Sequence, residues 1–103
     1  MITDFQKKLY ALTKKVPRGK VTSYSAIAKK LKSSPRAVGQ ALRVNPFAPI
    51  VPCHRVIKSD GSIGGFSGEI TGKPIQRKIA MLRNEGVCFA HHKVKYKLII
   101  RHL

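Results

Sequence analysis

The residue pair Cys53-His54 carries the clearest chemistry that this sequence offers. A cysteine attacks as its thiolate, a form that a neighbouring base or cation favours. His54 is a suitable base because an imidazole titrates near neutral pH, and Arg55 adds a positive charge beside it. The alternative is a buried cysteine that packs as a small hydrophobic residue, which is the usual role of a free thiol. The dipeptide alone does not decide between these two roles.

Three prolines shape the segment around this pair. Pro46, Pro49 and Pro52 lack a backbone N–H, fix φ and push the residue before each of them toward extended geometry. Residues 45–56 are therefore predicted to form a rigid, ordered loop that is neither a helix nor the middle of a sheet. Apolar residues on both sides of Cys53 predict that its thiol lies in an apolar wall.

The composition points to a polyanionic partner. The 103 residues suffice for one domain, and 21 Lys and Arg against 4 Asp and Glu give a net charge of +17. Nucleic acid is the first candidate and an anionic membrane surface the second, although no stretch is long enough to cross a membrane. No secretory signal is visible, so we expect an intracellular protein, in the cytoplasm or in a eukaryotic nucleus, with both cysteines reduced.

The elements that must position the pair begin with a helix after Thr3. The pattern Thr3-x-x-Gln6 has the form of a capping box, and Pro17 with Gly19 stops the helix. Its apolar stripe consists of Phe5, Leu9, Leu12 and Val16.

Two further helices are predicted at about residues 25–31 and 35–44. Ser34 is a favourable N-cap, and Pro35 occupies the first helical position, where proline is preferred. Two short helices joined by a tight turn predict a helix-turn-helix, in which the second helix normally contacts DNA. The inward-facing residues are predicted to be Ile27, Leu31, Val38, Ala41 and Leu42.

The second half of the chain alternates short elements with glycines. Val56-Ile57 is predicted as a short strand and residues 58–62 as a turn containing Asp60-Gly61. Four glycines within residues 64–72 predict a flexible lid or a close approach of the backbone to a ligand. A last helix is expected from Pro74 to Gly86, with Ile75, Ile79 and Leu82 on one stripe.

The C-terminal segment, residues 88–103, is predicted to be separate from the domain formed by residues 1–87. Its residues alternate between apolar and basic from 93 to 100, a strand-like period. An added strand, an oligomer contact and a linker to another domain all fit this pattern.

Several motifs together resemble the O6-alkylguanine-DNA alkyltransferases. The resemblance spans about residues 3–87 in one order, which is more specific than any single short motif. It is carried by residues 17–24, 34–42, 45–46, 52–56, 64–68 and 83–86. The implied fold is mainly α, a winged-helix-like DNA-binding domain with a helix-turn-helix and short β elements.

The resemblance implies a set of catalytic residues. Cys53 matches the family's nucleophile, and His54 matches the histidine that reaches it through a water and pairs with the glutamate at Glu85. Asn45 matches the residue that braces the active-site loop. Tyr24 matches the tyrosine that donates a proton toward a ring nitrogen of the base and helps to rotate the nucleotide out of the duplex.

The resemblance also implies how DNA is held. Arg36 matches the finger that fills the gap left by the flipped base, and the family docks its second helix in the minor groove. The expected DNA-contacting residues are Tyr24, Ser25, Arg36, Ala37, Gly39, Arg43 and Ser59. The expected alkylguanine pocket contains Val56, Phe66 and Ser67. The sequence departs from many members at Phe66, where they carry tyrosine, and at Glu69, where glycine is frequent.

The implied function is DNA repair by irreversible transfer of the alkyl group of O6-alkylguanine in double-stranded DNA to Cys53, with O4-alkylthymine as a further substrate. Each molecule is expected to act once, as a monomer, with no metal or other cofactor. The first alternative is a non-catalytic helix-turn-helix protein that binds alkylated DNA, although related proteins of that kind replace the cysteine.

Three other functions are weaker alternatives. A Cys-His hydrolase would need an oxyanion hole and would leave the helix-turn-helix without a role. A helix-turn-helix regulator would leave the Cys53 loop unexplained. A zinc site could combine Cys88, His91 and His92 with Cys53 or His54, but Cys-x-x-His alone supplies only half the ligands of a structural zinc site.

Overall fold

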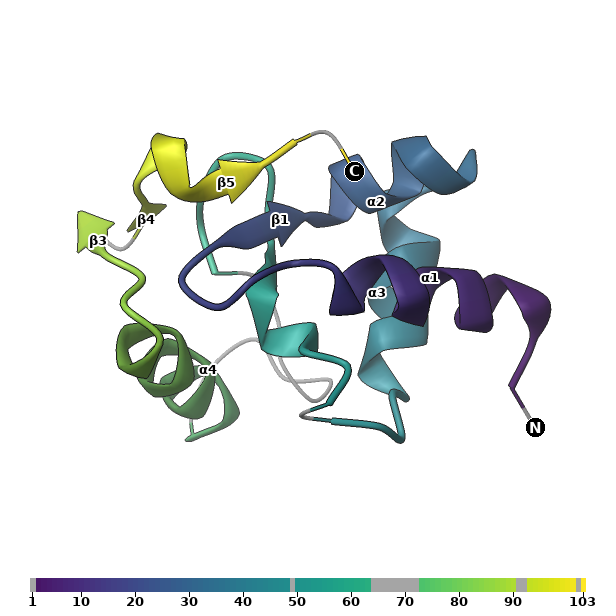
Figure 1. The fold of residues 1–103 in the computed structure, drawn as a ribbon, viewed down its shortest axis with the longest axis horizontal. Helices are drawn as coiled ribbons and strands as arrows, with labels where there is room; N and C mark the ends of the chain where they lie inside the picture. Colours follow the sequence, from purple (N-terminus) through teal and green to yellow (C-terminus); the bar gives the residue numbers. More distant parts are fainter. Residues whose placement is uncertain (1, 49, 64–72, 91–92, 102) are drawn as a thin grey trace.

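Helices, a small parallel sheet and a two-stranded antiparallel hairpin make up the described part of the computed structural model (Figure 1). It describes residues 2–48, 50–63, 73–90, 93–101 and 103. The predicted glycine-rich loop, with Phe66, Ser67 and Glu69, lies outside the described residues. Within the described part, no helix is both long and apolar enough to pass through a membrane.

The first helix, α1 (Asp4–Lys14), begins at the predicted capping box. Thr3 Oγ1 accepts the Gln6 N–H at 3.1 Å, and Gln6 Oε1 accepts the Thr3 N–H at 2.9 Å. These two bonds satisfy backbone donors that the first turn of a helix leaves without partners. The predicted inward stripe is confirmed, since Leu9 and Val16 are fully buried.

The predicted helix-turn-helix consists of α2 (Tyr24–Leu31) and α3 (Pro35–Arg43). Ser23 caps α2 by accepting from Ala26 N, and Ser34 caps α3 by accepting from Ala37 N. Each helix lies within one residue of its predicted bounds. Because both caps are local in sequence, they fix the helix starts without help from tertiary contacts.

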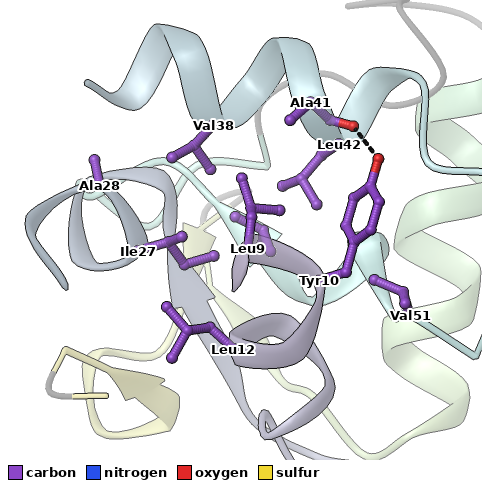
Figure 2. Close-up of a cluster of buried hydrophobic side chains, with 10 residues drawn as sticks. Leu9, Tyr10, Leu12, Ile27, Ala28, Val38, Ala41, Leu42 and Val51 are labelled. Carbon is purple, nitrogen blue, oxygen red and sulfur yellow. Dashed lines mark hydrogen bonds between the residues drawn. The ribbon is translucent and has the colours of Figure 1, made fainter. Parts of the chain in front are cut away.

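The three N-terminal helices enclose the first of two cores (Figure 2). The Tyr10 hydroxyl reaches across this core and donates to the Ala41 carbonyl of α3 at 2.9 Å. The buried phenol therefore has a hydrogen-bond partner. The core contains Leu9, Tyr10, Leu12, Ile27, Ala28, Val38, Ala41, Leu42, Val51 and Val56.

The parallel sheet has the order β2-β1-β5, with β1 (Val21–Ser23) between β2 (Val56–Ile57) and β5 (Ile99–Ile100). Thr22 of β1 lies opposite Val56 on one side and Ile100 on the other. The predicted strand at residues 56–57 is therefore confirmed. The central strand ends where α2 begins, so Tyr24, the first residue of α2, directly follows the sheet.

The last helix, α4 (Lys73–Asn84), packs against the Cys53 segment and closes the second core. Gly86 has φ +88° just past its end, as expected for a glycine that terminates a helix, and Val87 N donates to Leu82 O at 3.0 Å. The buried residues of this core are Val21, Ile57, Ile63, Leu82, Val87 and Val94.

The structure refines two sequence predictions. Residues 45–56 were predicted to form an ordered loop that is neither a helix nor the middle of a sheet, and within it Cys53–Arg55 forms one 3₁₀ turn, closed by the Arg55 N–H donating to Pro52 O at 2.9 Å. The strand-like alternation of residues 93–100, for which an added strand, an oligomer contact and a linker were all open, is divided among short elements. β3 (Phe89–Ala90) and β4 (Lys93–Val94) form a hairpin, a 3₁₀ turn follows at Tyr96–Leu98, and β5 is added to the parallel sheet. The chain must bend there because β4 and β5 pair with different partners.

Candidate active site and nucleic-acid interface

The turn that carries Cys53 is braced from inside the preceding loop. Asn45 Nδ2 donates to Val51 O at 3.0 Å, and Asn45 Oδ1 accepts the Phe47 N–H at 2.9 Å. The Cys53 N–H donates to Val51 O at 2.8 Å, so one carbonyl anchors both the brace and the turn. Cys53 itself is half-buried, a position from which a thiol can reach a ligand.

Glu85 joins His54 to Arg55 behind this turn. His54 Nε2 lies 3.0 Å from Glu85 Oε2, and in the neutral tautomer that donates to Glu85 its Nδ1 is left as an acceptor. Arg55 holds the same carboxylate with two nitrogens, Nε to Oε1 at 2.9 Å and Nη2 to Oε2 at 2.7 Å. Arg55 Nη1 also donates to Val16 O at 2.9 Å, which ties the site to the segment after α1.

The electrostatics of this group favour a neutral imidazole beside an ionised carboxylate. Burial lowers the pKa of His54 and outweighs the opposite effect of Glu85. Burial raises the pKa of Glu85, but hydrogen bonds from Arg55 and His54 prevail and lower it to about 2. Among the described residues, no hydrogen bond joins the Cys53 thiol to His54, so a proton would need a bridging water to pass between them.

The side chains of Tyr24 and Lys78 lie close to each other and to the turn that carries Cys53. Burial, with a smaller contribution from the charge of Cys53, raises the pKa of Tyr24 to about 12, so the phenol keeps its proton at neutral pH. Lys78 is fully buried, and its Nζ donates to Val56 O at 2.7 Å and Ile63 O at 2.9 Å. Its Nζ also lies 5.8 Å from the centre of the Tyr24 ring.

Lys78 was not among the predicted site residues, although the sequence carries a signal for its burial. Ile75, Lys78, Ile79 and Leu82 follow the i, i+3, i+4, i+7 spacing of a single helical face, so a lysine stands inside an apolar stripe. Burial lowers the pKa of Lys78 to about 7, while the charge of Cys53 acts in the opposite direction.

The expected DNA-contacting residues lie on α2, α3 and the turn after β2. Arg36 is exposed in the first turn of α3, and Ser25, Arg43 and Ser59 are also exposed. Ala37 and Gly39 are half-buried. A methyl group built on Gly39 would meet nothing within 4 Å, so the space beside this stretch of α3 is open and no large side chain projects from Ala37 or Gly39.

Some expected site residues are placed differently or lie outside the described residues. Val56 is fully buried in the first core, and its carbonyl accepts from Lys78. Phe66 and Ser67 are not among the described residues. No group of three or more metal-ligating side chains occurs within the described ranges, and Cys88 is exposed there, while His91 and His92 lie outside them.

Comparison with known families decides the class of the protein. Residues 4–87 match the family model described as 6-O-methylguanine DNA methyltransferase, DNA binding domain. The chain belongs to this family. Within it, the chain is 49% identical over 86 residues to the methylated-DNA–protein-cysteine methyltransferase of Thermococcus sibiricus, an alignment that covers 82% of this chain and 46% of that protein. The chain thus spans about half the length of such curated methyltransferases.

A second relative is the DNA base-flipping protein of Thermus thermophilus, 52% identical over 62 residues, with 60% of this chain and 42% of that protein covered. Solved methyltransferase structures share the fold. The O6-methylguanine-DNA methyltransferase of Pyrococcus kodakaraensis superimposes with a TM-score of 0.72 at 46% identity, covering 84% of this chain and 48% of the other.

Similarity over nearly the full length is found with S. pombe Atl1, solved in complex with damaged DNA containing O6-carboxymethylguanine. Its TM-score is 0.76 at 31% identity, and the alignment covers 97% of this chain and 98% of the other. The mainly helical fold with a helix-turn-helix and short strands, expected from the sequence of this methyltransferase-family chain, is therefore confirmed.

Proposed function

We propose that this protein repairs DNA by transferring the alkyl group of O6-alkylguanine in a duplex irreversibly to Cys53. The observation that carries the proposal is the half-buried Cys53 on a 3₁₀ turn whose next two residues, His54 and Arg55, hold Glu85. A binding protein needs no such relay beside a cysteine, whereas a nucleophile needs a base that is itself oriented by a third group.

The reaction removes one proton from sulfur and replaces the carbon–oxygen bond of the alkyl group with a carbon–sulfur bond. His54 Nδ1 takes the thiol proton through a water, and Glu85 stabilises the imidazolium that forms. The thiolate attacks the alkyl carbon, a carbon–sulfur bond forms, and the bond from that carbon to O6 breaks. The electron pair moves into the purine, and the Tyr24 hydroxyl supports the resulting charge by donating toward a ring nitrogen. The product is a thioether, so each molecule acts once.

Access to O6 requires extrusion of the nucleotide, because the atom cannot be reached inside the base stack. In the proposed complex α3 lies in the minor groove, with Arg36 entering the duplex and the small residues Ala37 and Gly39 allowing close approach. Arg43, Ser25 and Ser59 contact the backbone. The protein binds as a monomer, and the carriers of function lie in residues 1–87, with residues 88–103 as an extension.

A second candidate is a non-catalytic protein that binds alkylated DNA. Similarity to S. pombe Atl1 over nearly the whole chain, and to a base-flipping protein, favours lesion binding of some kind. Both candidates predict tight binding to O6-methylguanine duplexes, so binding alone does not separate them. Covalent modification of Cys53 does.

The test is the intact mass of the protein after incubation with an O6-methylguanine duplex. We expect a gain of about 14 Da, one methyl group on a nucleophilic cysteine, with peptide mapping that locates it on Cys53. A parallel duplex containing O4-methylthymine tests the second substrate.

Two cysteine variants complete this experiment. Cys53→Ala should bind the lesion and gain no mass, whereas Cys88→Ala, which removes the exposed second thiol, should react as the parent does. A methyl group on Cys88, or release of more methyl than there is protein, contradicts the proposal. Binding with no mass gain by the parent favours the non-catalytic candidate.

A further inference from the structure

The C-terminal segment holds the turn that follows β2, and it lies beyond the residues matched by the family model. Val94 N donates to Gly61 O at 2.9 Å, and Ser62 pairs with Lys93 in an antiparallel bridge. Arg101 Nη2 donates to Ser59 O at 3.0 Å. Residues 93–101 therefore contact the turn at both of its ends.

The turn packs tightly against the C-terminal segment at Gly61. Gly61 has φ +92°, a region that favours glycine, and a Cβ there would lie 3.2 Å from Val94 O. Inside the turn, Gly61 N donates to Lys58 O at 3.0 Å, and Ser62 donates to Asp60 Oδ1 through both its backbone and its hydroxyl. This turn is compact by its own bonds. The buried residues Ile57 and Ile63 fix its two ends, and the C-terminal segment adds hydrogen bonds to Ser59 and Gly61.

The segment is fixed to the body of the protein independently of the turn. In Figure 1, β5 runs alongside β1, and the Thr22 hydroxyl donates to Ile100 O at 2.7 Å. Val94 is buried in the second core, and Leu98 and Ile99 pack against it. Arg101 therefore extends to the turn from an anchored strand.

We propose that residues 93–101 act as a clamp that holds the turn at residues 58–62 in the geometry required for contact with duplex DNA, with Arg101 as its positioning residue. The inference rests on the proposed function, in which Ser59 contacts the DNA backbone. The free modified base does not reach Ser59, and its reaction is independent of the clamp.

The first experiment compares Arg101→Met with Lys97→Met. Both remove one positive charge from the segment, but Lys97 is exposed and makes no side-chain contact with the turn among the described residues. Single-turnover transfer from duplex DNA should slow about tenfold in Arg101→Met, the effect expected when one hydrogen bond from a charged donor is lost. Transfer from free O6-methylguanine should stay within about twofold, and Lys97→Met should match the parent on both substrates. Arg101→Lys keeps a charged donor and should partly restore duplex transfer.

The second experiment measures amide hydrogen exchange in the turn. Exchange at Val94 should be faster in Arg101→Met than in Lys97→Met, because its amide forms the bond between the segment and Gly61, whereas the Gly61 amide is bonded within the turn to Lys58 O and should exchange alike in both. Gly61→Ala disturbs the same contact from the side of the turn and should give the same difference between duplex and free base.

The outcomes separate the clamp from the proposed function. Equal duplex rates for Arg101→Met and Lys97→Met overturn the clamp, as does faster exchange without any loss of duplex transfer. If the parent transfers no alkyl group to Cys53, the proposed function fails, and exchange together with duplex affinity then tests the clamp. In that case unchanged exchange or unchanged duplex affinity in Arg101→Met overturns it.

Discussion

Two nitrogens of Arg55 and one of His54 bind the Glu85 carboxylate, which therefore links the two residues after Cys53 to the end of α4. The pKa of Glu85 is about 2, below the ordinary 4.5 of a glutamate. A depressed carboxyl pKa contributes stability that is present above pH 4.5 and is lost as the pH falls toward 2. At neutral pH the carboxylate is thus available both to orient His54 and to stabilise it when protonated.

Glu85→Gln should slow methyl transfer by about 100-fold or more, since an amide cannot stabilise the imidazolium and base catalysis contributes an effect of that size. Binding to the lesion should change by only a few-fold. The measurement is the single-turnover rate at saturating protein, with folding checked by circular dichroism.

Asp4→Asn is the matched control for this variant, because it removes a carboxylate from the exposed first turn of α1 and leaves the site intact. It should transfer at the parental rate. An unchanged rate in folded Glu85→Gln would show that Glu85 has only a structural role near the end of α4.

The burial of Lys78 makes the stability of the folded protein depend on pH in the alkaline range. Its pKa in the folded protein is about 7, against an ordinary 10.5, so between these values the unfolded chain binds the additional proton. The free energy of unfolding therefore rises with pH between about 7 and 10.5. Below about pH 7 Lys78 is protonated in the folded and the unfolded state, and the stability gained at higher pH is absent. Lys78→Met lacks this dependence.

We expect the free energy of unfolding of the parent, minus that of Lys78→Met, to increase by a few kcal/mol between pH 7 and 10, the scale set by a shift of several pKa units. Urea unfolding at four pH values measures the difference. Lys29→Met, which removes an exposed lysine of α2, serves as the control and should show no such trend. A flat difference for Lys78→Met would mean that Lys78 keeps its proton when buried.

At the scale of elements, the position of Arg36 follows from the start of α3. Ser34 caps the helix, Pro35 opens it, and Arg36 is the next residue, exposed at the leading end. A phosphate contact at this position would provide salt-dependent affinity without regard to sequence. A finger that replaces an extruded base instead stabilises a state that costs a few kcal/mol to form.

Arg36→Ala should therefore slow methyl transfer from duplex DNA much more than transfer from the free base, which needs no extrusion. A gap or mismatch opposite the lesion should partly restore the rate, because less stacking and pairing must then be broken. Arg43→Ala removes the same charge from the last turn of α3 and should affect affinity and its salt dependence rather than this ratio. Equal slowing of Arg36→Ala on every substrate would contradict the role of a finger.

The helices could be predicted from the sequence because their signals are local. Thr3, Ser34 and Gly86 lie at helix ends, where their side chains or backbone conformations act on the nearest turn. The sheet could not, since each strand contributes two or three residues and pairs with a partner far along the chain. Val21–Ser23 in particular gave no sign of being central to a sheet.

The candidate site, like the fold, could be predicted from the sequence only in part. The resemblance correctly brought His54 and Glu85 together, a contact of 3.0 Å. It did not indicate that Arg55 is the second partner of Glu85, because a residue's neighbour in sequence does not reveal where its side chain points. The burial of Lys78 was not predicted, because a lysine in an apolar stripe is expected to extend its charged end to solvent.

At the scale of the whole molecule, the two cores differ in how far apart in sequence their members lie. The first is formed by α1, α2 and α3 with residues up to Val56. The second combines Val21 of β1 with Leu82 of α4 and Val94 of β4. The buried members of the first core lie between positions 9 and 56, and those of the second between positions 21 and 94, so the second core is completed later along the chain.

This difference has a consequence while the chain is being synthesised. Glu85 follows His54 by 31 residues, and Ile100 follows Thr22 by 78. At a synthesis rate of about 5–20 residues per second, the carboxylate is made roughly 2–6 s after the histidine, and the sheet is completed roughly 4–16 s after its central strand. The nascent chain thus carries Cys53 and His54 before it carries Glu85, the carboxylate proposed to orient the imidazole, so the proposed relay stays incomplete until Glu85 has been made.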